Sequence, residues 1–133
     1  MIVVDSSAVI AILFGEPSAE RLTTRLAADP DRVISAVSYV EAGTVLVGRR
    51  LRDRSQAIAD LDAFLTEAGI EIAQIDAVQA RIALTARITY GRGMGHGGML
   101  NFGDACSYAL AKFLNAPLLN VGDDFTTTDI AIA

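Results

Sequence analysis

MIVVDSSAVIAIL, residues 1–13, decides how this chain folds. The first four residues are apolar and include two β-branched valines, which is typical of a short strand buried on both faces. The apolar run resumes at Ala8 in helical form, and Gly15 and Pro17 end that helix. Asp5 stands between strand and helix, and a carboxylate there is costly to bury unless something pairs with it. Asp5 therefore either caps the helix or holds a cation.

The rest of the chain repeats this alternation of strands and helices. Apolar runs predict further strands at 32–36, 71–75 and 117–121, and an edge strand at 130–133. Helical patterns separate them at 18–28, 38–50, 55–68, 76–90 and 104–114. Residues 91–103 hold six glycines and no apolar period, which predicts a loop. Together these elements predict a three-layer α/β fold with a mainly parallel sheet.

Length and composition indicate one globular domain over residues 1–133. Apolar residues make up 52% of the chain and charged residues 20%. The single cysteine, Cys106, excludes an internal disulfide and favours a reducing compartment. The first residues lack the basic region of a secretory signal, and no run approaches the roughly 20 apolar residues that span a bilayer. We therefore expect a cytoplasmic protein.

Acidic residues recur where the expected strands and helices meet. Asp5 ends the first strand, Glu41 lies one turn into the helix after the second, and Asp104 begins the helix after the glycine-rich loop. Asp123 and Asp124 follow the strand at 117–121. Ligands of such folds bind at the carboxyl ends of the strands, so these acids are expected to converge. Carboxylates that close need a cation, and Mg²⁺ and Mn²⁺ favour oxygen ligands.

Each of these acids also has a purely structural explanation. Asp5 and Asp104 could be helix N-caps, and Asp123-Asp124 could belong to a turn. Ser38 and Glu41 form the S-x-x-E pattern of a capping box. The apolar surroundings of Asp5, Glu41 and Asp104 favour the metal site, because a capping acid is usually exposed.

Four motifs in this order and spacing resemble the PIN-domain family and, within it, the VapC toxins of bacterial toxin–antitoxin pairs. The motifs are MIVVDSSAVIAIL (1–13), SYVEAGTVL (38–46), NFGDACSYALA (101–111) and LLNVGDDFTTTDI (118–130). The resemblance covers nearly the whole chain. It implies a PIN-like fold and a metal-dependent ribonuclease that serves as the toxin of a type II toxin–antitoxin module.

The resemblance also implies which acids do the chemistry. Asp5 and Asp104 match the main metal ligands, and Glu41 and Asp123 match residues that complete the site directly or through waters. One or two Mg²⁺ or Mn²⁺ ions would assist hydrolysis of an RNA phosphodiester bond. The expected catalytic set is therefore Asp5, Glu41, Asp104 and Asp123.

Two further details of the site depend on the resemblance. Many relatives carry an acid three residues before the Phe, where this chain has Gly122, so Asp124 is the alternative to Asp123 as the fourth acid. Ser6 or Ser7 matches a small hydroxyl residue that orients the first carboxylate or a water.

Partners follow from the same resemblance. We expect an RNA substrate, no membrane, and a small VapB-like antitoxin whose C-terminal segment blocks the acidic groove. We also expect a homodimer, with residues 18–28 and 38–50 as the candidate surface. The chain has net charge −5 but ten arginines, and the candidates to contact RNA are Arg49, Arg50, Arg52 and Arg54. The alternative for this cluster is a solvated helix end.

Three other classes of protein gather acids in a similar way. A receiver domain needs an acidic pair near its first strand and a lysine at a late strand, but this chain has one acid there and places Lys112 in a helix. A haloacid-dehalogenase-like phosphatase needs Asp-x-Asp after the first strand, and position 7 is Ser. The third class is a non-catalytic α/β binding module whose acids are all caps.

Overall fold

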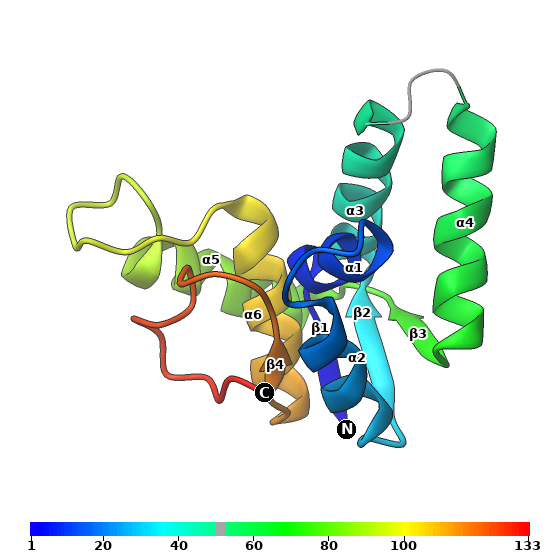
Figure 1. Ribbon diagram of the computed structural model, residues 1–133. Coiled ribbons are helices and arrows are strands. Elements are labelled where there is room, and N and C mark those ends of the chain that lie inside the picture. Colours follow the sequence, from blue (N-terminus) through cyan, green and yellow to red (C-terminus); the bar gives the residue numbers. More distant parts are fainter. Residues whose placement is uncertain (50–52) are drawn as a thin grey trace.

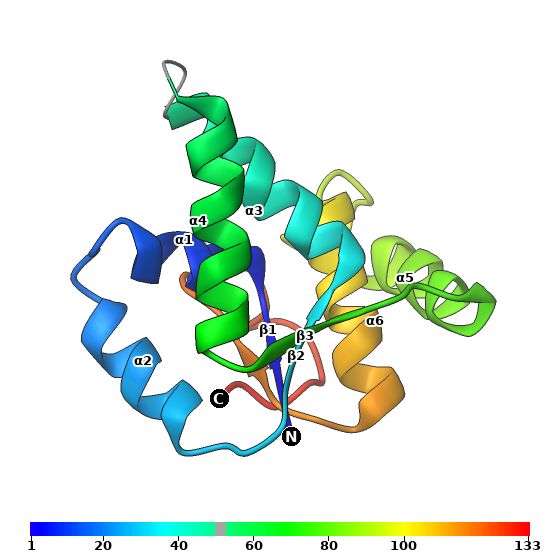
Figure 2. The same cartoon turned by 90° about the vertical axis from the view of Figure 1, so that its right-hand side faces the viewer.

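A parallel sheet between two groups of helices forms the molecule (Figures 1 and 2). The computed structural model describes residues 1–49 and 53–133. The strands lie in the order β3-β2-β1-β4, with bounds β1 Ile2–Val4, β2 Arg32–Ser35, β3 Ile70–Ala73 and β4 Leu118–Leu119. The helices are α1 Ser6–Leu13, α2 Ala19–Ala27, α3 Ala36–Arg49, α4 Arg54–Glu67, α5 Ala77–Tyr90 and α6 Phe102–Leu114. The predicted three-layer α/β fold with a parallel sheet is confirmed.

β1 is the central strand and contributes to the cores on both faces of the sheet. Ile2 and Val4 pack in the core shared with α1 to α4, whereas Val3 packs in the core shared with α5 and α6. All three side chains are fully buried. Successive side chains of a strand point to opposite faces, so a strand covered on both sides must be apolar throughout.

Helix α6 packs closely against its surroundings. Every residue from Gly103 to Ala111 is buried, because the helix contacts α5, α3 and the sheet around its circumference. Small residues such as Ala105 and Ala109 let the neighbouring elements approach it closely. Polar residues in this stretch are therefore held inside the protein.

Some predicted boundaries differ from the structure. Helix α3 begins at Ala36, so Ser38 lies inside the helix and the predicted Ser38–Glu41 capping box is wrong. Helix α6 begins at Phe102 because Asn101, not Asp104, is its N-cap. The predicted edge strand at 130–133 is reduced to one bridge between Leu118 and Ile132.

The helices are short compared with the thickness of a membrane. The longest of those described have 14 residues, fewer than the roughly 20 that a bilayer span requires. Among residues 1–49 and 53–133, no helix combines the length and the apolar character of a membrane span.

Candidate active site

Asp5 leaves the end of β1 with its backbone and its side chain both held. Its N–H donates to the Leu119 carbonyl of β4 at 2.9 Å, and only 2% of the residue is exposed. Its Oδ2 atom accepts from the backbone N–H and from the hydroxyl of Ser7, at 3.0 and 2.6 Å. Asp5 is therefore the N-cap of α1, as the structural explanation predicts.

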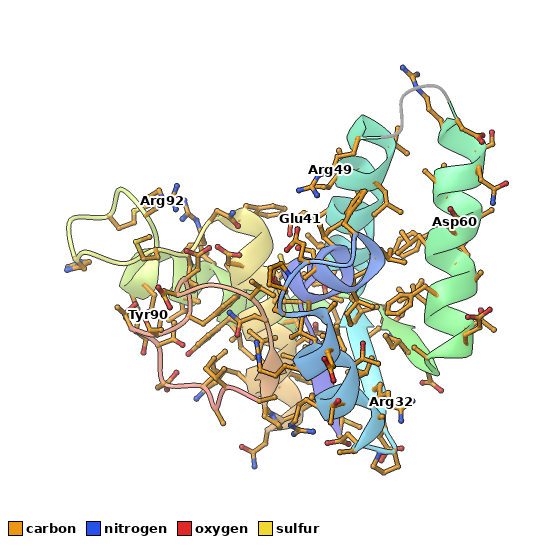
Figure 3. The ribbon with its side chains drawn as sticks, viewed as in Figure 1. Arg32, Glu41, Arg49, Asp60, Tyr90 and Arg92 are labelled. Atoms are coloured by element: carbon orange, nitrogen blue, oxygen red, sulfur yellow. The ribbon has the colours of Figure 1, made fainter. Side chains whose placement is uncertain are left out.

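Glu41 reaches the same region from α3. Figure 3 shows it on the flank of α3 that faces α1, and its Oε1 atom accepts a hydrogen bond from the Ser6 hydroxyl. Its Oε2 atom lies against Gly103, where a Cβ atom would overlap it. The carboxylate thus lies over the first turn of α6, where the helix dipole favours negative charge.

Asp104 lies in the first turn of α6 and forms a capping box with Asn101. The Asp104 N–H donates to Asn101 Oδ1 at 2.8 Å, and the Asn101 N–H donates to Asp104 Oδ2 at 2.9 Å. Burial raises the pKa of Asp104 to about 6, although the Asn101 hydrogen bond acts against this rise. The charges of Asp5, Asp124 and Glu41 are smaller contributions to the same rise. The fold therefore brings these four carboxylates within electrostatic reach of one another.

The two acids after β4 lie in different environments. Asp124 is half-buried and its charge acts on Asp104, whereas Asp123 is exposed. The carbonyl of Asp123 accepts from the backbone N–H and hydroxyl of Thr126, at 3.0 and 2.7 Å, which closes a turn. Gly122 begins this turn at φ +92°, a conformation that favours glycine. Of these two acids, Asp124 is the one whose charge raises the pKa of Asp104.

The donors around this site suit a hard divalent cation. All four groups are carboxylates, and Cys106 is buried with the pKa of its thiol raised, which disfavours the thiolate that binds metals. Within residues 1–49 and 53–133, however, no three Asp, Glu, His or Cys side chains are grouped so that they could jointly hold an ion. Asp5, Glu41 and Asp104 are each hydrogen-bonded to their own neighbours instead. The carboxylate donors therefore fit a hard divalent ion chemically. In the metal-free protein, hydrogen bonds to neighbouring residues hold these side chains in place.

The candidate RNA-contacting arginines are only partly described. Arg49 lies beyond Glu41 along α3, half-exposed, with its guanidinium 4.5 Å from the centre of the Phe14 ring and 3.8 Å from Glu16 (Figure 3). Arg54 is exposed at the first turn of α4. Arg50 and Arg52 lie outside the described residues.

The sequence patterns did not single out two residues that contact the acids. Gly103 leaves room for Glu41, and the buried Ser107 donates from its hydroxyl to Asp5 Oδ1 at 2.6 Å. A signal existed for Ser107, because it lies three residues after Asp104 and so shares its face of the helix. No comparable signal existed for Gly103, whose role depends on a residue of another helix.

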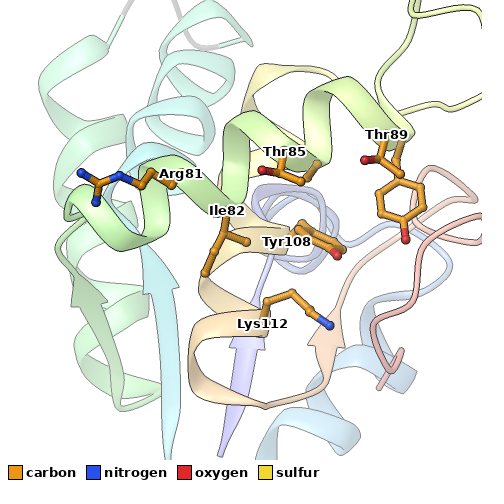
Figure 4. Close-up of a pocket in the computed structure, with 8 residues that line it drawn as sticks. Arg81, Ile82, Thr85, Thr89, Tyr108 and Lys112 are labelled. Atoms are coloured by element: carbon orange, nitrogen blue, oxygen red, sulfur yellow. The ribbon is translucent and has the colours of Figure 1, made fainter.

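A separate groove lies between α5 and α6 (Figure 4). Tyr108 lines it, and the Tyr108 hydroxyl donates to Asp129 at 2.6 Å. Lys112, which also lines it, donates to the same carboxylate at 3.0 Å. None of the four converging acids lines this groove.

Comparison with known proteins places the whole chain in one family. Residues 2–131 match the model of the PIN domain. Ribonuclease VapC42 of Mycobacterium tuberculosis is 44% identical over 128 residues, which cover 96% of this chain and 95% of that protein. Ribonuclease VapC of Mycolicibacterium smegmatis is 42% identical over 129 residues, or 97% of each.

Solved structures share the fold at lower sequence identity. VapC20 of M. tuberculosis, described as a toxin that cleaves the sarcin-ricin loop, superposes with a TM-score of 0.76 at 17% identity, over 100% of this chain and 98% of that one. VapBC2 of Rickettsia felis, bound to a promoter DNA fragment, gives 0.75 at 20% identity, over 99% and 96%.

Proposed function

This chain belongs to the PIN-domain family, with VapC ribonucleases as relatives, and we propose on this basis that it is the toxin of a toxin–antitoxin module and cleaves RNA. The observation that carries the assignment to a site is that Asp5 and Glu41 both reach the start of α6 beside Asp104, Asp5 through Ser107 and Glu41 against Gly103. The raised pKa of Asp104, caused by burial and by the charges of Asp5, Asp124 and Glu41, agrees with this placement. Asp5 and Asp104 are buried and Glu41 and Asp124 are half-buried, and carboxylates that repel one another in such surroundings are stabilised when a cation binds.

We propose Mg²⁺ or Mn²⁺, one or two ions per site, as the cofactor, with Asp5 and Asp104 as its main ligands. When bound, such an ion supplies Lewis-acid assistance to phosphodiester hydrolysis. The protein contributes the positions of the carboxylates: Ser7 holds Asp5 and Ser6 holds Glu41. These contacts support Ser6 and Ser7 as orienting residues.

We propose Asp124 as the fourth acid in place of Asp123. Asp124 is half-buried and acts on Asp104, and Asp123 is exposed at the turn. The hydrogen bonds of Thr126 go to the backbone carbonyl of Asp123, so the Asp123 carboxylate takes no part in closing the turn.

A non-catalytic binding module is the alternative function, and the capping roles of two of the acids favour it. Asp5 does cap α1, and Asp104 does complete the capping box of α6. Capping and ligation are compatible, because each carboxylate has about four acceptor positions. The ribonuclease names of the relatives favour the enzyme. The match to the PIN domain also argues against the receiver-domain and phosphatase alternatives.

The purified chain tests the proposal directly. We expect it to cleave RNA with Mg²⁺ or Mn²⁺ and to stop when EDTA is added. Asp5→Asn and Asp104→Asn should each abolish cleavage while circular dichroism and the melting temperature show a folded protein. Asp129→Asn is the matched control, because Asp129 binds Tyr108 and Lys112 away from the site. Cleavage retained in both site variants would contradict the assignment.

A cellular experiment tests the toxin role. Expression of the chain alone should arrest bacterial growth, and the same two site substitutions should relieve the arrest. Mapped cleavage ends from the arrested cells would identify the RNA. Unimpaired growth despite soluble, RNA-cleaving protein would contradict the toxin role and leave the ribonuclease intact.

An antitoxin is the expected protein partner, because structural neighbours are toxin–antitoxin complexes. We propose that a C-terminal segment of a small VapB-like antitoxin enters the acidic groove. An arginine of that segment would form charge-assisted hydrogen bonds with the carboxylates and compete with the cation. A short reading frame for a small DNA-binding protein directly upstream would support this.

We also propose a homodimer, but with a different surface from the one predicted at 18–28. The apolar residues of α2, Leu22 and Leu26, are buried in the core, so this helix presents polar residues outward. Leu84 and Ile88 of α5 are 63% and 57% exposed, and Val40 of α3 is 63% exposed. These residues are the better candidates for the contact.

We propose that the protein acts in the cytoplasm, where RNA and an antitoxin would be available. Arg49 and Arg54 are the described candidates to contact the RNA backbone, because the Arg49 side chain is half-exposed at the end of α3 and Arg54 is exposed at the start of α4.

A further inference from the structure

A line of buried hydroxyl groups connects α3 to Asp5. The Ser38 hydroxyl of α3 lies 2.8 Å from the Ser107 hydroxyl of α6, and the latter lies 2.6 Å from Asp5 Oδ1. Both serines are fully buried. The three residues come from three different elements, so the contact exists only in the folded protein.

The number of hydrogens that each group can donate sets the donor-to-acceptor direction of these two hydrogen bonds. An ionised carboxylate only accepts hydrogen bonds, and a serine hydroxyl has a single hydrogen. Ser107 must therefore give its hydrogen to Asp5 and accept one from Ser38. The order Ser38 to Ser107 to Asp5 is that of a charge-assisted network, in which each bond polarises the next.

Ser107 completes the fixation of the Asp5 carboxylate. Ser7 holds Oδ2 through its N–H and its hydroxyl, and the Ser7 hydroxyl in turn accepts from the Val121 N–H at 3.0 Å. Ser107 holds the other oxygen, so both ends of the carboxylate are fixed. The described donors occupy three of about four acceptor positions, and the one left over is on Oδ1.

Ser38 and Ser107 each lie three residues from an acid of the site on the same helix. Ser38 precedes Glu41 by three residues on α3, and Ser107 follows Asp104 by three on α6. Residues three apart share a helix face. The contact between Ser38 and Ser107 therefore lies one turn from the place where Glu41 meets Gly103.

We propose that Ser107, assisted by Ser38, is a positioning residue for the proposed ribonuclease site: it sets the orientation of the Asp5 carboxylate and leaves one acceptor position free for a ligand. This inference rests on the proposed function. The competing explanation is that the serines only join α3 to α6. Alanine would pack in the same space without the cost of burying hydroxyl groups, and α6 uses alanine at 105, 109 and 111.

The test uses four variants of the full chain: Ser107→Ala, Ser38→Ala, the double variant, and the control Ser35→Ala. Ser35 is buried like the others, and its hydroxyl accepts from the Val37 N–H at 3.3 Å rather than from a site residue. The measurements are Mn²⁺ affinity by calorimetry, kcat and KM on RNA, and the free energy of unfolding in denaturant.

We expect Ser107→Ala to weaken Mn²⁺ binding and lower kcat by about ten- to a hundredfold, the range typical of groups that orient a ligand, with little change in KM. Ser38→Ala should have a smaller effect, because the Ser107 hydroxyl still reaches Asp5. The double variant should match Ser107→Ala in kcat and Mn²⁺ affinity. It should also be more stable than Ser107→Ala, since it leaves no Ser38 hydroxyl without its partner.

Mn²⁺ affinity and kcat of Ser107→Ala equal to those of Ser35→Ala would overturn the proposal. If the losses of kcat and Mn²⁺ affinity from Ser38→Ala and Ser107→Ala multiply in the double variant, the two serines act independently. That result would overturn the order Ser38 to Ser107 to Asp5. If Ser107→Ala does not fold, Ser38→Ala alone decides, because unchanged Mn²⁺ affinity and kcat there would contradict the role of Ser38. A wild-type chain that binds Mn²⁺ but cleaves no RNA would instead contradict the proposed function. The Mn²⁺ affinities of the variants would then still test whether Ser38 and Ser107 position Asp5.

Discussion

At the scale of single residues, the acids of this site serve the fold and the proposed chemistry at once. Asp5 caps α1 with one oxygen while its other oxygen is held by Ser107. Asp104 accepts the Asn101 N–H in a capping box. A carboxylate bonded in this way is oriented before any ligand arrives, which limits the reorganisation that binding requires.

A substitution at Gly103 that adds one Cβ atom tests whether the position of the Glu41 carboxylate matters. In Gly103→Ala the new Cβ would overlap the Glu41 carboxylate, which is the end of a flexible side chain and can move. Alanine also favours a helix over glycine by about 0.5–1 kcal/mol. We therefore expect a melting temperature within a few degrees of wild type, and kcat/KM for RNA lowered by about tenfold or more.

Gly48→Ala is the matched control for Gly103→Ala. Gly48 also lies in a helix, and a Cβ atom there meets nothing within 4 Å. Full activity in Gly103→Ala, or equal losses in the two variants, would show that the position of Glu41 does not depend on Gly103.

At the scale of elements, the turn after β4 decides which acid joins the site. The bonds of Thr126 to the Asp123 carbonyl close the turn with Asp123 exposed, whereas Asp124 is half-buried and its charge raises the pKa of Asp104. Asp124→Asn should lower kcat by about tenfold or more, and Asp123→Asn should leave it within about twofold. Asp124→Asn should also lower the pKa of Asp104, measured by NMR, because it removes a charge that raises it. The reverse order of the two variants would reinstate Asp123.

At the scale of the whole molecule, the burial of the Asp104 carboxylate near the other acids reduces the stability of the metal-free protein. The pKa of Asp104 is about 6 in the folded state and 3.8 in an ordinary environment, so the folded state favours the protonated form. Stability is therefore lost as the pH rises through this interval, by up to about 3 kcal/mol. The loss is largest above the folded pKa of about 6.

Asp104→Asn removes this charge and keeps an oxygen to accept the Asn101 N–H. In EDTA we expect the variant to be more stable than wild type, with the gain at pH 7.5 about twice that at pH 5. Mg²⁺ should raise the melting temperature of wild type and leave that of the variant unchanged. A variant less stable than wild type at both pH values would show that the capping role of the carboxylate outweighs the cost of burying its charge.

Assembly provides the second test at this scale. Leu84→Glu or Ile88→Glu on α5 should convert a dimer to a monomer in light scattering, because a charge would be buried in the contact. Ala59→Glu, at an exposed position of α4, is the control. Dimers that persist in both α5 variants would exclude this face.

Much of the fold could be predicted from the order of residues along the chain. A run such as MIVV is apolar at every position because both faces of its strand are covered, and this requirement is visible without knowing the covering helices. The acids could be found for a similar reason, since strand ends and helix starts are local features. Residues 36 and 37 could not be assigned to α3, because Ser38 resembles a helix cap until Ser107 is known to bind it.

The sequence by itself determined the parallel α/β fold, the family, and the proposed set Asp5, Glu41 and Asp104. The fold and the acids depend on short-range patterns whose physical requirement is met within a few residues, whereas the family depends on the resemblance of four motifs in order along the chain. Only the tertiary structure decided that the charge of Asp124 acts on Asp104, that Gly103 makes room for Glu41, and that Ser38 and Ser107 lead to Asp5. These contacts join residues of different elements, and their geometry is set by how α3, α6 and β1 pack, which no local pattern encodes.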